Sequence, residues 1–159
     1  MKRNRIEKYL RQAIKLAIET AKSGLGGPFG TVIAREDELI ATGVNLVTLM
    51  NDPTAHAEML AIRSACQKLG TFDLSGCEIY TSCEPCPMCL GAVYWARIGR
   101  LYFACTRDDA ASSGFDDAVI YRELALTPEE RKLRSESMLR EEGLEAFRKW
   151  LENPERVQY

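Results

Sequence analysis

The first part of the chain changes from helical to strand spacing of its apolar residues. Between residues 4 and 23, apolar side chains recur every three or four positions, which predicts an amphipathic helix that ends at Gly24. The stretches "FGTVIARE" (29–36) and "ELIATGVNLV" (38–47) show alternation and β-branched residues, so they predict two strands around a turn near Asp37. A helix followed by a β-hairpin is therefore expected.

The next part of the chain repeats a rhythm of helix and strand. In "NDPTAHAEMLAIRSACQKLG", Asp and Pro precede apolar residues at helical spacing, so a helix is expected to begin between Pro53 and His56 and to stop at Gly70. "CEIYTS" predicts a strand, "CPMCLGAVYWARIG" a buried helix and "RLYFACT" another strand. This rhythm is typical of an α/β sandwich. Beyond residue 106 the pattern weakens into a loop with a short helix and a charged, mostly helical tail.

Length and composition favour one soluble domain. A chain of 159 residues with 46% hydrophobic content is expected to form a single domain, residues 1–159. It opens without an apolar signal core and has no stretch near the ~20 apolar residues of a membrane span, so we expect a cytoplasmic protein. Its six cysteines are then expected to be thiols or metal ligands rather than disulfides, with Cys66, Cys77 and Cys105 as small buried side chains. Lys and Arg total 21 against 23 Asp and Glu, which argues against a broad nucleic-acid surface.

Candidate metal ligands stand where two helices are expected to begin. Cys86 and Cys89 are three residues apart, which places them on one helix face, and His56 lies at the start of the other helix. One imidazole and two thiolates form a ligand set that suits zinc, and a helix N-terminus favours thiolate over thiol. Because His56 is the only histidine of the chain, the sequence excludes a two-histidine zinc site and a second histidine as base.

A third cysteine, Cys83 in "TSCEPCPMC" (81–89), leaves two interpretations of the site open. With Cys83 as a fourth ligand, the site is closed and structural; with three ligands, one coordination position stays open for water. The open site is favoured because Pro85 pushes Glu84 into an extended conformation, which carries Cys83 away from the face shared by Cys86 and Cys89. It also gives a role to the carboxylate of "HAE", which can lean over the helix end toward the metal.

The combination of HxE, as "HAE" (56–58), with PCxxC, as "PCPMC" (85–89), is the signature of zinc-dependent nucleobase deaminases. The stretches "GGPFGTVI", "NDPTAHAE", "YTSCEPCPMCLGAVYWAR" and "GFDDAVIY" further resemble the bacterial guanine deaminases of the cytidine deaminase superfamily, from about residue 24 to 122. The resemblance implies a three-layer α/β/α sandwich with a five-stranded mixed sheet and one zinc ion per subunit. It also implies a homodimer whose C-terminal segments, about residues 127–159, can be exchanged.

The resemblance implies hydrolytic deamination of guanine to xanthine and ammonia, in purine catabolism or salvage. It makes Glu58 the catalytic proton shuttle and puts Asp117 on the purine edge, as a catalytic and substrate-binding group. Leu46 stands where the family often has a second asparagine, so one polar neighbour of the pocket is open to question. The other assignments are the zinc ligands His56, Cys86 and Cys89, the pocket residues Phe29 and Asn45, and the lid residue Tyr159.

Two other functions stay open at this point. Deaminases of guanosine, of aminated triazines and of adenosine in tRNA share both motifs, although the lack of a basic tail and the presence of "GFDDAVIY" argue against tRNA. The second alternative is a non-catalytic zinc module in which Cys83 completes the ligand set. Ammonia release from a panel of substrates separates these functions.

Overall fold

The structure, a computed structural model, describes residues 2–159 and divides the chain into two compact units. The N-terminal unit runs to Asp117, and the C-terminal unit comprises Ala118–Tyr159. No helix in the described range is both long enough and apolar enough to cross a membrane.

A mixed sheet forms the centre of the N-terminal unit. The described residues contain four strands, in the order β2-β1-β3-β4. The central strand β1 is antiparallel to both β2 and β3, whereas β3 and β4 run parallel. The hairpin turn lies between β1 and β2, as the alternation predicted. The strand bounds are β1 Gly30–Arg35, β2 Glu38–Val44, β3 Glu78–Cys83 and β4 Arg100–Cys105.

The expected fifth strand is absent from residues 2–159, so that part of the fold prediction is wrong. Directly after β4, Thr106 caps the helix α5 (Arg107–Ser112), and the side chains and backbone N–H groups of Thr106 and Asp109 form a reciprocal capping box. Because this box starts a helix one residue after the strand, the chain has no extended run left to pair with the edge of β4.

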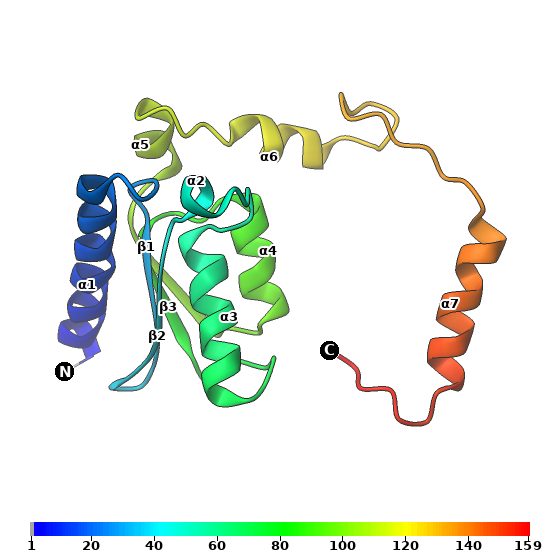
Figure 1. The fold of residues 1–159 in the computed structure, drawn as a ribbon, viewed down its shortest axis with the longest axis horizontal. Helices are drawn as coiled ribbons and strands as arrows, with labels where there is room; N and C mark the ends of the chain where they lie inside the picture. The colour runs from blue at the N-terminus through cyan, green and yellow to red at the C-terminus, as the bar shows by residue number, and fades with distance from the viewer. Residues whose placement is uncertain (1) are drawn as a thin grey trace. The chain divides into compact units, whose positions relative to one another are not determined.

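Helices cover both faces of the sheet, which confirms the predicted three-layer α/β/α sandwich (Figure 1). The helix α1 (Lys2–Ser23) packs on β1 and β3, while α3 (Ala57–Leu69) packs on β1 and β2. The helix α4 (Pro87–Trp95) lies beside α3 on the second face. Alternate strand residues enter two separate cores because successive side chains of a strand point to opposite faces. The core under α1 contains Tyr9, Ala13, Val32, Ala34 and Tyr80.

Two glycines bring the helical layers into direct contact with the sheet. A Cβ atom at Gly43 of β2 would collide with the carbonyl oxygen of Ala57 in the first turn of α3. On the other face, a Cβ atom at Gly30 of β1 would collide with the carbonyl oxygen of Ala13 in α1. At both points the helix backbone lies directly against the strand backbone, so there is no room for a side chain. Glycine at these two positions thus allows the short distance between each helix and the sheet.

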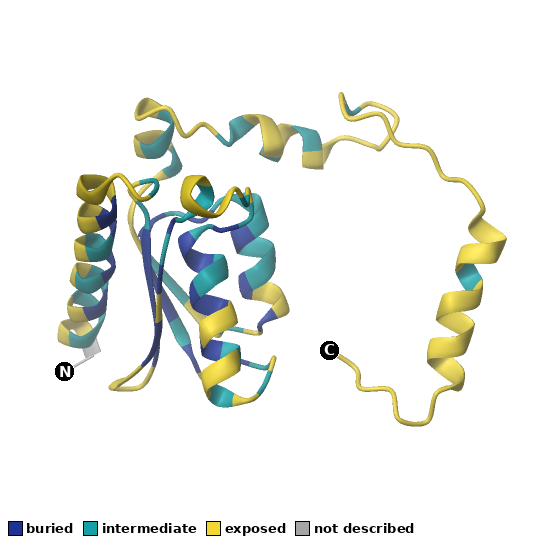
Figure 2. Ribbon diagram, in the orientation of Figure 1, coloured by how far each residue is buried: buried dark blue, intermediate teal, exposed yellow. Residues whose placement is uncertain are grey.

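The C-terminal unit holds two helices, α6 (Ala118–Ala125) and α7 (Arg140–Glu152). Within the described chain, no residue of either helix is buried, and Figure 2 shows α7 almost entirely in the colour of exposed residues. Residues 126–139 form turns and irregular backbone, so the expectation of a mostly helical tail is wrong for this stretch. The helix α7 ends at Glu152, just before Pro154, as the position of that proline predicted.

Candidate metal centre

The N-termini of α3 and α4 present the three candidate zinc ligands. His56 is the N-cap of α3 and Cys86 the N-cap of α4, and both have extended backbone conformations. Neither side chain makes a capping hydrogen bond to a described residue. A residue at this position projects beyond the first turn, so both side chains are available to a ligand. Pro87 at the start of α4 needs no N–H partner and explains why the helix begins there.

The distances between these side chains fit a zinc ion. The Nδ1 atom of His56 lies 3.6 Å from the sulfur of Cys86 and 3.5 Å from the sulfur of Cys89. Two ligands of a tetrahedral zinc ion, at ordinary Zn–N and Zn–S bond lengths, lie about 3.5 to 3.8 Å apart. The donor set and its spacing therefore fit zinc with three protein ligands.

The pKa values of the two candidate ligand thiols are shifted in opposite directions. A hydrogen bond from Cys89 and a hydrogen bond with His56 together outweigh the opposing effect of burial and lower the pKa of Cys86 to about 4. The same sulfur-to-sulfur hydrogen bond, together with burial, raises the pKa of Cys89. Cys86 is thus the thiolate and Cys89 the thiol of the pair. A metal ion that binds both sulfurs displaces the remaining proton.

Glu58 lies next to this group in the first turn of α3, with only 6% of its surface exposed. Its Oε2 atom accepts a hydrogen bond of 3.5 Å from the sulfur of Cys89. Burial raises the pKa of the Glu58 carboxyl, and the nearby thiolate of Cys86 adds to this rise. A carboxyl group with a raised pKa, held beside a metal centre, is suited to accept and return a proton near neutral pH.

Cys83 occupies a different place from the other two cysteines of its segment. It ends β3, and its sulfur donates a hydrogen bond of 3.3 Å to the carbonyl oxygen of Thr106. Among the described residues, the group that can hold a metal ion comprises His56, Cys86 and Cys89, without Cys83. The arrangement matches the open three-ligand site.

Asn45 ties together the loops at the carboxyl end of the hairpin. Its side chain is 7% exposed, and its Oδ1 atom accepts N–H groups from Gly27 (3.2 Å) and Val47 (3.3 Å). The side-chain oxygen is thus engaged by the protein, which leaves the amide NH2 group to donate to a ligand. Leu46 uses its backbone N–H to bind Ala55, so the departure from asparagine there leaves this part of the backbone paired.

Phe29 and Asp117 meet residues that sequence reasoning missed. The ring of Phe29 lies against Phe115 in an edge-to-face arrangement, with centroids 5.0 Å apart.

Burial raises the pKa of the half-buried Asp117, Arg107 opposes this rise, and the thiolate of Cys86 adds to it. Asp117 is therefore close enough to the candidate centre to sense its charge. The motif "GFDDAVIY" could have drawn attention to Phe115, but Arg107 carried no comparable signal.

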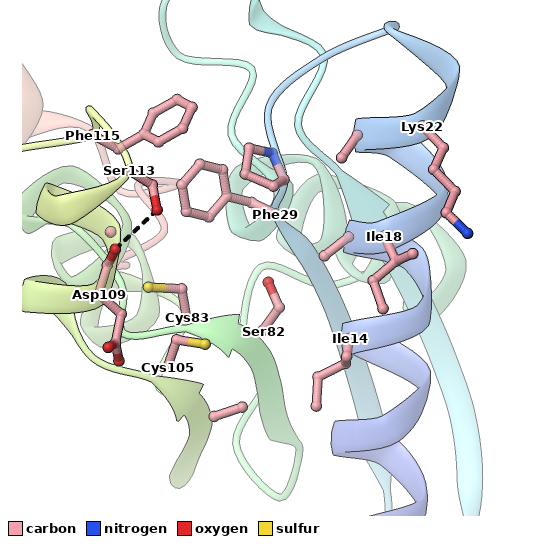
Figure 3. Close-up of a pocket in the computed structure, with 15 residues that line it drawn as sticks. Ile14, Ile18, Lys22, Phe29, Ser82, Cys83, Cys105, Asp109, Ser113 and Phe115 are labelled. Atoms are coloured by element: carbon pink, nitrogen blue, oxygen red, sulfur yellow. Dashed lines mark hydrogen bonds between the residues drawn. The ribbon is translucent and has the colours of Figure 1, made fainter.

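A pocket of about 460 Å³ lies between α1 and α5 (Figure 3). It shares Phe29 with the predicted substrate site, but its described lining includes neither the zinc-ligand group nor Glu58, Asn45 or Asp117. The pocket is thus a separate feature of the N-terminal unit. Tyr159 belongs to the C-terminal unit, where it is 71% exposed, and its predicted role as a lid stays a prediction.

Comparison with known proteins gives a consistent result. The chain is 50% identical to the guanine deaminase of Bacillus subtilis over 91% of its own length and 92% of the relative. The X-ray structure of guanine deaminase from Bacillus subtilis superposes with a TM-score of 0.93 at 48% identity, covering 96% of this chain and 98% of that one. The tRNA-specific adenosine deaminase of Aquifex aeolicus is 44% identical over 57% of this chain and 62% of its own. Residues 3–105 match the cytidine and deoxycytidylate deaminase zinc-binding region, and the chain therefore belongs to this family of zinc-binding deaminases.

Proposed function

We propose that this protein hydrolyses guanine to xanthine and ammonia at the centre formed by His56, Cys86 and Cys89. The observation that carries the proposal is the buried carboxyl of Glu58, which contacts a ligand sulfur and has a raised pKa. A closed structural zinc site has no need of such a group. The extensive identity to a guanine deaminase supports the choice of substrate.

The chemistry divides between the metal and Glu58. When bound, zinc supplies the Lewis acidity that makes water a nucleophile near neutral pH. Glu58 accepts the proton that the water loses as its oxygen attacks C2 of guanine. The same carboxyl passes this proton to the ring nitrogen, then accepts the proton still held by the attacking oxygen and passes it to the departing amine, so the C–N bond breaks, the new C=O bond forms and ammonia leaves. Burial of Glu58 keeps competing water away from these proton transfers.

The polar groups around the centre complement guanine. The N1–H and the exocyclic NH2 of guanine are donors, so the carboxylate of Asp117 is a suitable acceptor for that edge. The amide NH2 of Asn45, whose oxygen the protein already uses, suits an acceptor atom of the purine. The ring of Phe29 offers an apolar surface to the flat base.

The C-terminal unit supports a further part of the proposal. The helix α7 has an apolar stripe of Leu144, Phe147 and Leu151, and no residue of this helix is buried in the described chain. We propose a homodimer in which residues 127–159 of each chain are exchanged, so that this stripe packs on the partner and Tyr159 covers a substrate pocket. We also place the protein in the cytoplasm, because a reducing compartment keeps the ligand cysteines as thiols.

The test uses purified, zinc-loaded protein with guanine, guanosine, adenine, cytosine, an aminated triazine and a tRNA. Ammonia release is measured for each compound, and xanthine formation is followed for guanine. The variant Glu58→Gln serves as the matched control for contaminating activity. Guanine as the preferred substrate supports the proposal. Ammonia from tRNA or another compound, with none from guanine, contradicts it, and no ammonia from any compound supports the structural zinc module.

A further inference from the structure

Two cysteines outside the metal centre lie next to each other where β3 and β4 end. Cys83 and Cys105 are register partners in this parallel pair of strands. Neighbouring strands are separated by about 4.8 Å, and register partners point to the same face of the sheet. A disulfide requires Cα atoms roughly 4.4 to 6.8 Å apart, so the backbone already places this pair within range.

The side chains support this placement. The sulfur of Cys83 donates to the carbonyl oxygen of Thr106, the residue that follows Cys105, so it reaches over the end of β4. Burial and, to a smaller extent, the proximity of Cys105 raise the pKa of Cys83 to about 11. Both cysteines line the pocket between α1 and α5, and Figure 3 shows them together beside Asp109, on the side opposite Ile14 and Ile18.

The two thiols differ in access to solvent. Cys105 is exposed, which contradicts the expectation that it is a buried side chain; β4 pairs only with β3 among the described strands and is therefore an edge. Cys83 is buried directly beside it. An accessible thiol next to a protected one is the arrangement of an attacking and a resolving cysteine. Cys66 and Cys77 form a contrasting pair, because Cys77 is a core residue with 1% exposure and Cys66, which is only partly buried and so differs from the expectation, packs against the same core.

We propose that Cys83 and Cys105 are a redox modification site, at which they form a reversible disulfide with an oxidised low-molecular-weight thiol such as glutathione disulfide. The Cys105 thiolate attacks one sulfur of that disulfide, whose S–S bond breaks, and one glutathione leaves with the proton that Cys105 lost. The sulfur of Cys83 then attacks Cys105 in the mixed disulfide and releases the second glutathione, which takes the proton of Cys83. Two protein thiols are oxidised, and one glutathione disulfide is reduced to two thiols.

The experiment treats the full-length, zinc-loaded protein with glutathione disulfide, blocks the remaining thiols and maps the peptides by mass spectrometry without reduction. The expected product joins the peptides of Cys83 and Cys105, retains its zinc and reverts with dithiothreitol. The variant Cys83→Ser is expected to stop with one glutathione on Cys105, because it lacks the resolving thiol. The variant Cys105→Ser is expected to leave Cys83 free, because burial protects that thiol.

Three results would overturn the proposal. The first is wild-type protein that remains unmodified, or that keeps glutathione on Cys105 with no internal link. The second is a primary link between Cys86 and Cys89 with loss of zinc. The third is a link between Cys66 and Cys77 at the same rate, which would show unselective oxidation through an opened core. All readouts are independent of deamination, so the outcome is separate from the proposed function.

Discussion

The N-terminal and C-terminal units contain helices of similar amphipathic character, yet only the first gives its helices a surface to cover. The helix α1 buries Tyr9 and Ala13 against the sheet. The helix α7 carries apolar side chains at the same spacing, and Phe147 on it remains 67% exposed. Helical periodicity is thus a local property, whereas burial depends on a sheet that other parts of the chain assemble. This difference is the reason for the proposal that α7 packs on a partner chain, and variants of this helix test it.

The largest expected effect comes from the candidate zinc ligands of the N-terminal unit. It tests whether the centre has three protein ligands or four. Cys86→Ser and Cys89→Ser are each expected to lose zinc and with it all guanine deamination, because two remaining ligands hold zinc poorly. The matched variant Cys83→Ser is expected to retain zinc, since its sulfur faces Thr106. Metal analysis and xanthine formation measure both effects. Equal zinc loss in the three variants would restore the closed, structural site.

The next effect concerns Glu58, the buried carboxyl of the same unit. Glu58→Gln is expected to keep the fold and the zinc while turnover falls on the order of a hundredfold or more, because the amide cannot accept and return the proton. Steady-state xanthine formation, with zinc content as the control, checks this. Turnover near that of the wild type would remove Glu58 from the mechanism.

A smaller effect is expected from the end of the C-terminal unit. Deletion of Val157 to Tyr159 is expected to lower guanine deamination roughly tenfold or more, since loss of about 1.4 kcal/mol of transition-state stabilisation lowers a rate tenfold. Zinc content and the thermal midpoint are expected to stay unchanged, because these residues are exposed. If the shortened chain deaminates guanine at the wild-type rate, Tyr159 is no lid.

The smallest expected effect concerns the strength of the proposed dimer and comes from the exposed stripe of α7. Burial of a Phe side chain contributes about 1.5 to 3 kcal/mol, so Phe147→Ser is expected to weaken the dimer roughly tenfold or more. The matched variant Arg148→Ser, on the neighbouring exposed position, is expected to leave dimerisation unchanged. Analytical ultracentrifugation over a concentration series compares the two. A dimer of equal strength in both variants would show that α7 takes no part in the interface.

The sequence predicted those elements whose signals are local. The helix of residues 57–69 begins after a proline and ends at Gly70, which has the positive φ angle that favours glycine, and the hairpin follows its alternation. The group that could hold a metal ion was also predicted, because HxE and PCxxC place its three residues at two helix starts. The presence of a fifth strand could not be predicted from local signals, because a strand needs both an extended segment and a free sheet edge to pair with. In the structure, the capping box of Thr106 and Asp109 starts a helix at the point where β4 ends.

The parts that escaped prediction depend on contacts between distant segments. Phe115 meets Phe29 across a separation of many residues, and neither residue type specifies the other in advance. The exposure of Cys105 follows from the position of β4 at the edge of the sheet, which strand order decides and composition does not. Burial raises the pKa of Asp117, which lies beyond the end of the capped helix α5, and Arg107 at the start of that helix opposes this rise.

The contact at Gly43 fixes the distance between β2 and the first turn of α3, which carries two residues of the candidate metal centre. The carbonyl oxygen of Ala57 rests on the bare backbone of β2, and Ala57 directly follows His56 and precedes Glu58. A side chain at position 43 would push the first turn of α3 away from β2. The imidazole of His56 and the carboxyl of Glu58 would then move together, whereas Cys86 and Cys89 belong to α4 and would not move with them. The position of His56 and Glu58 relative to Cys86 and Cys89 therefore depends on a residue that has no side chain, and substitution of Gly43 is expected to disturb the candidate centre without touching any of its ligands.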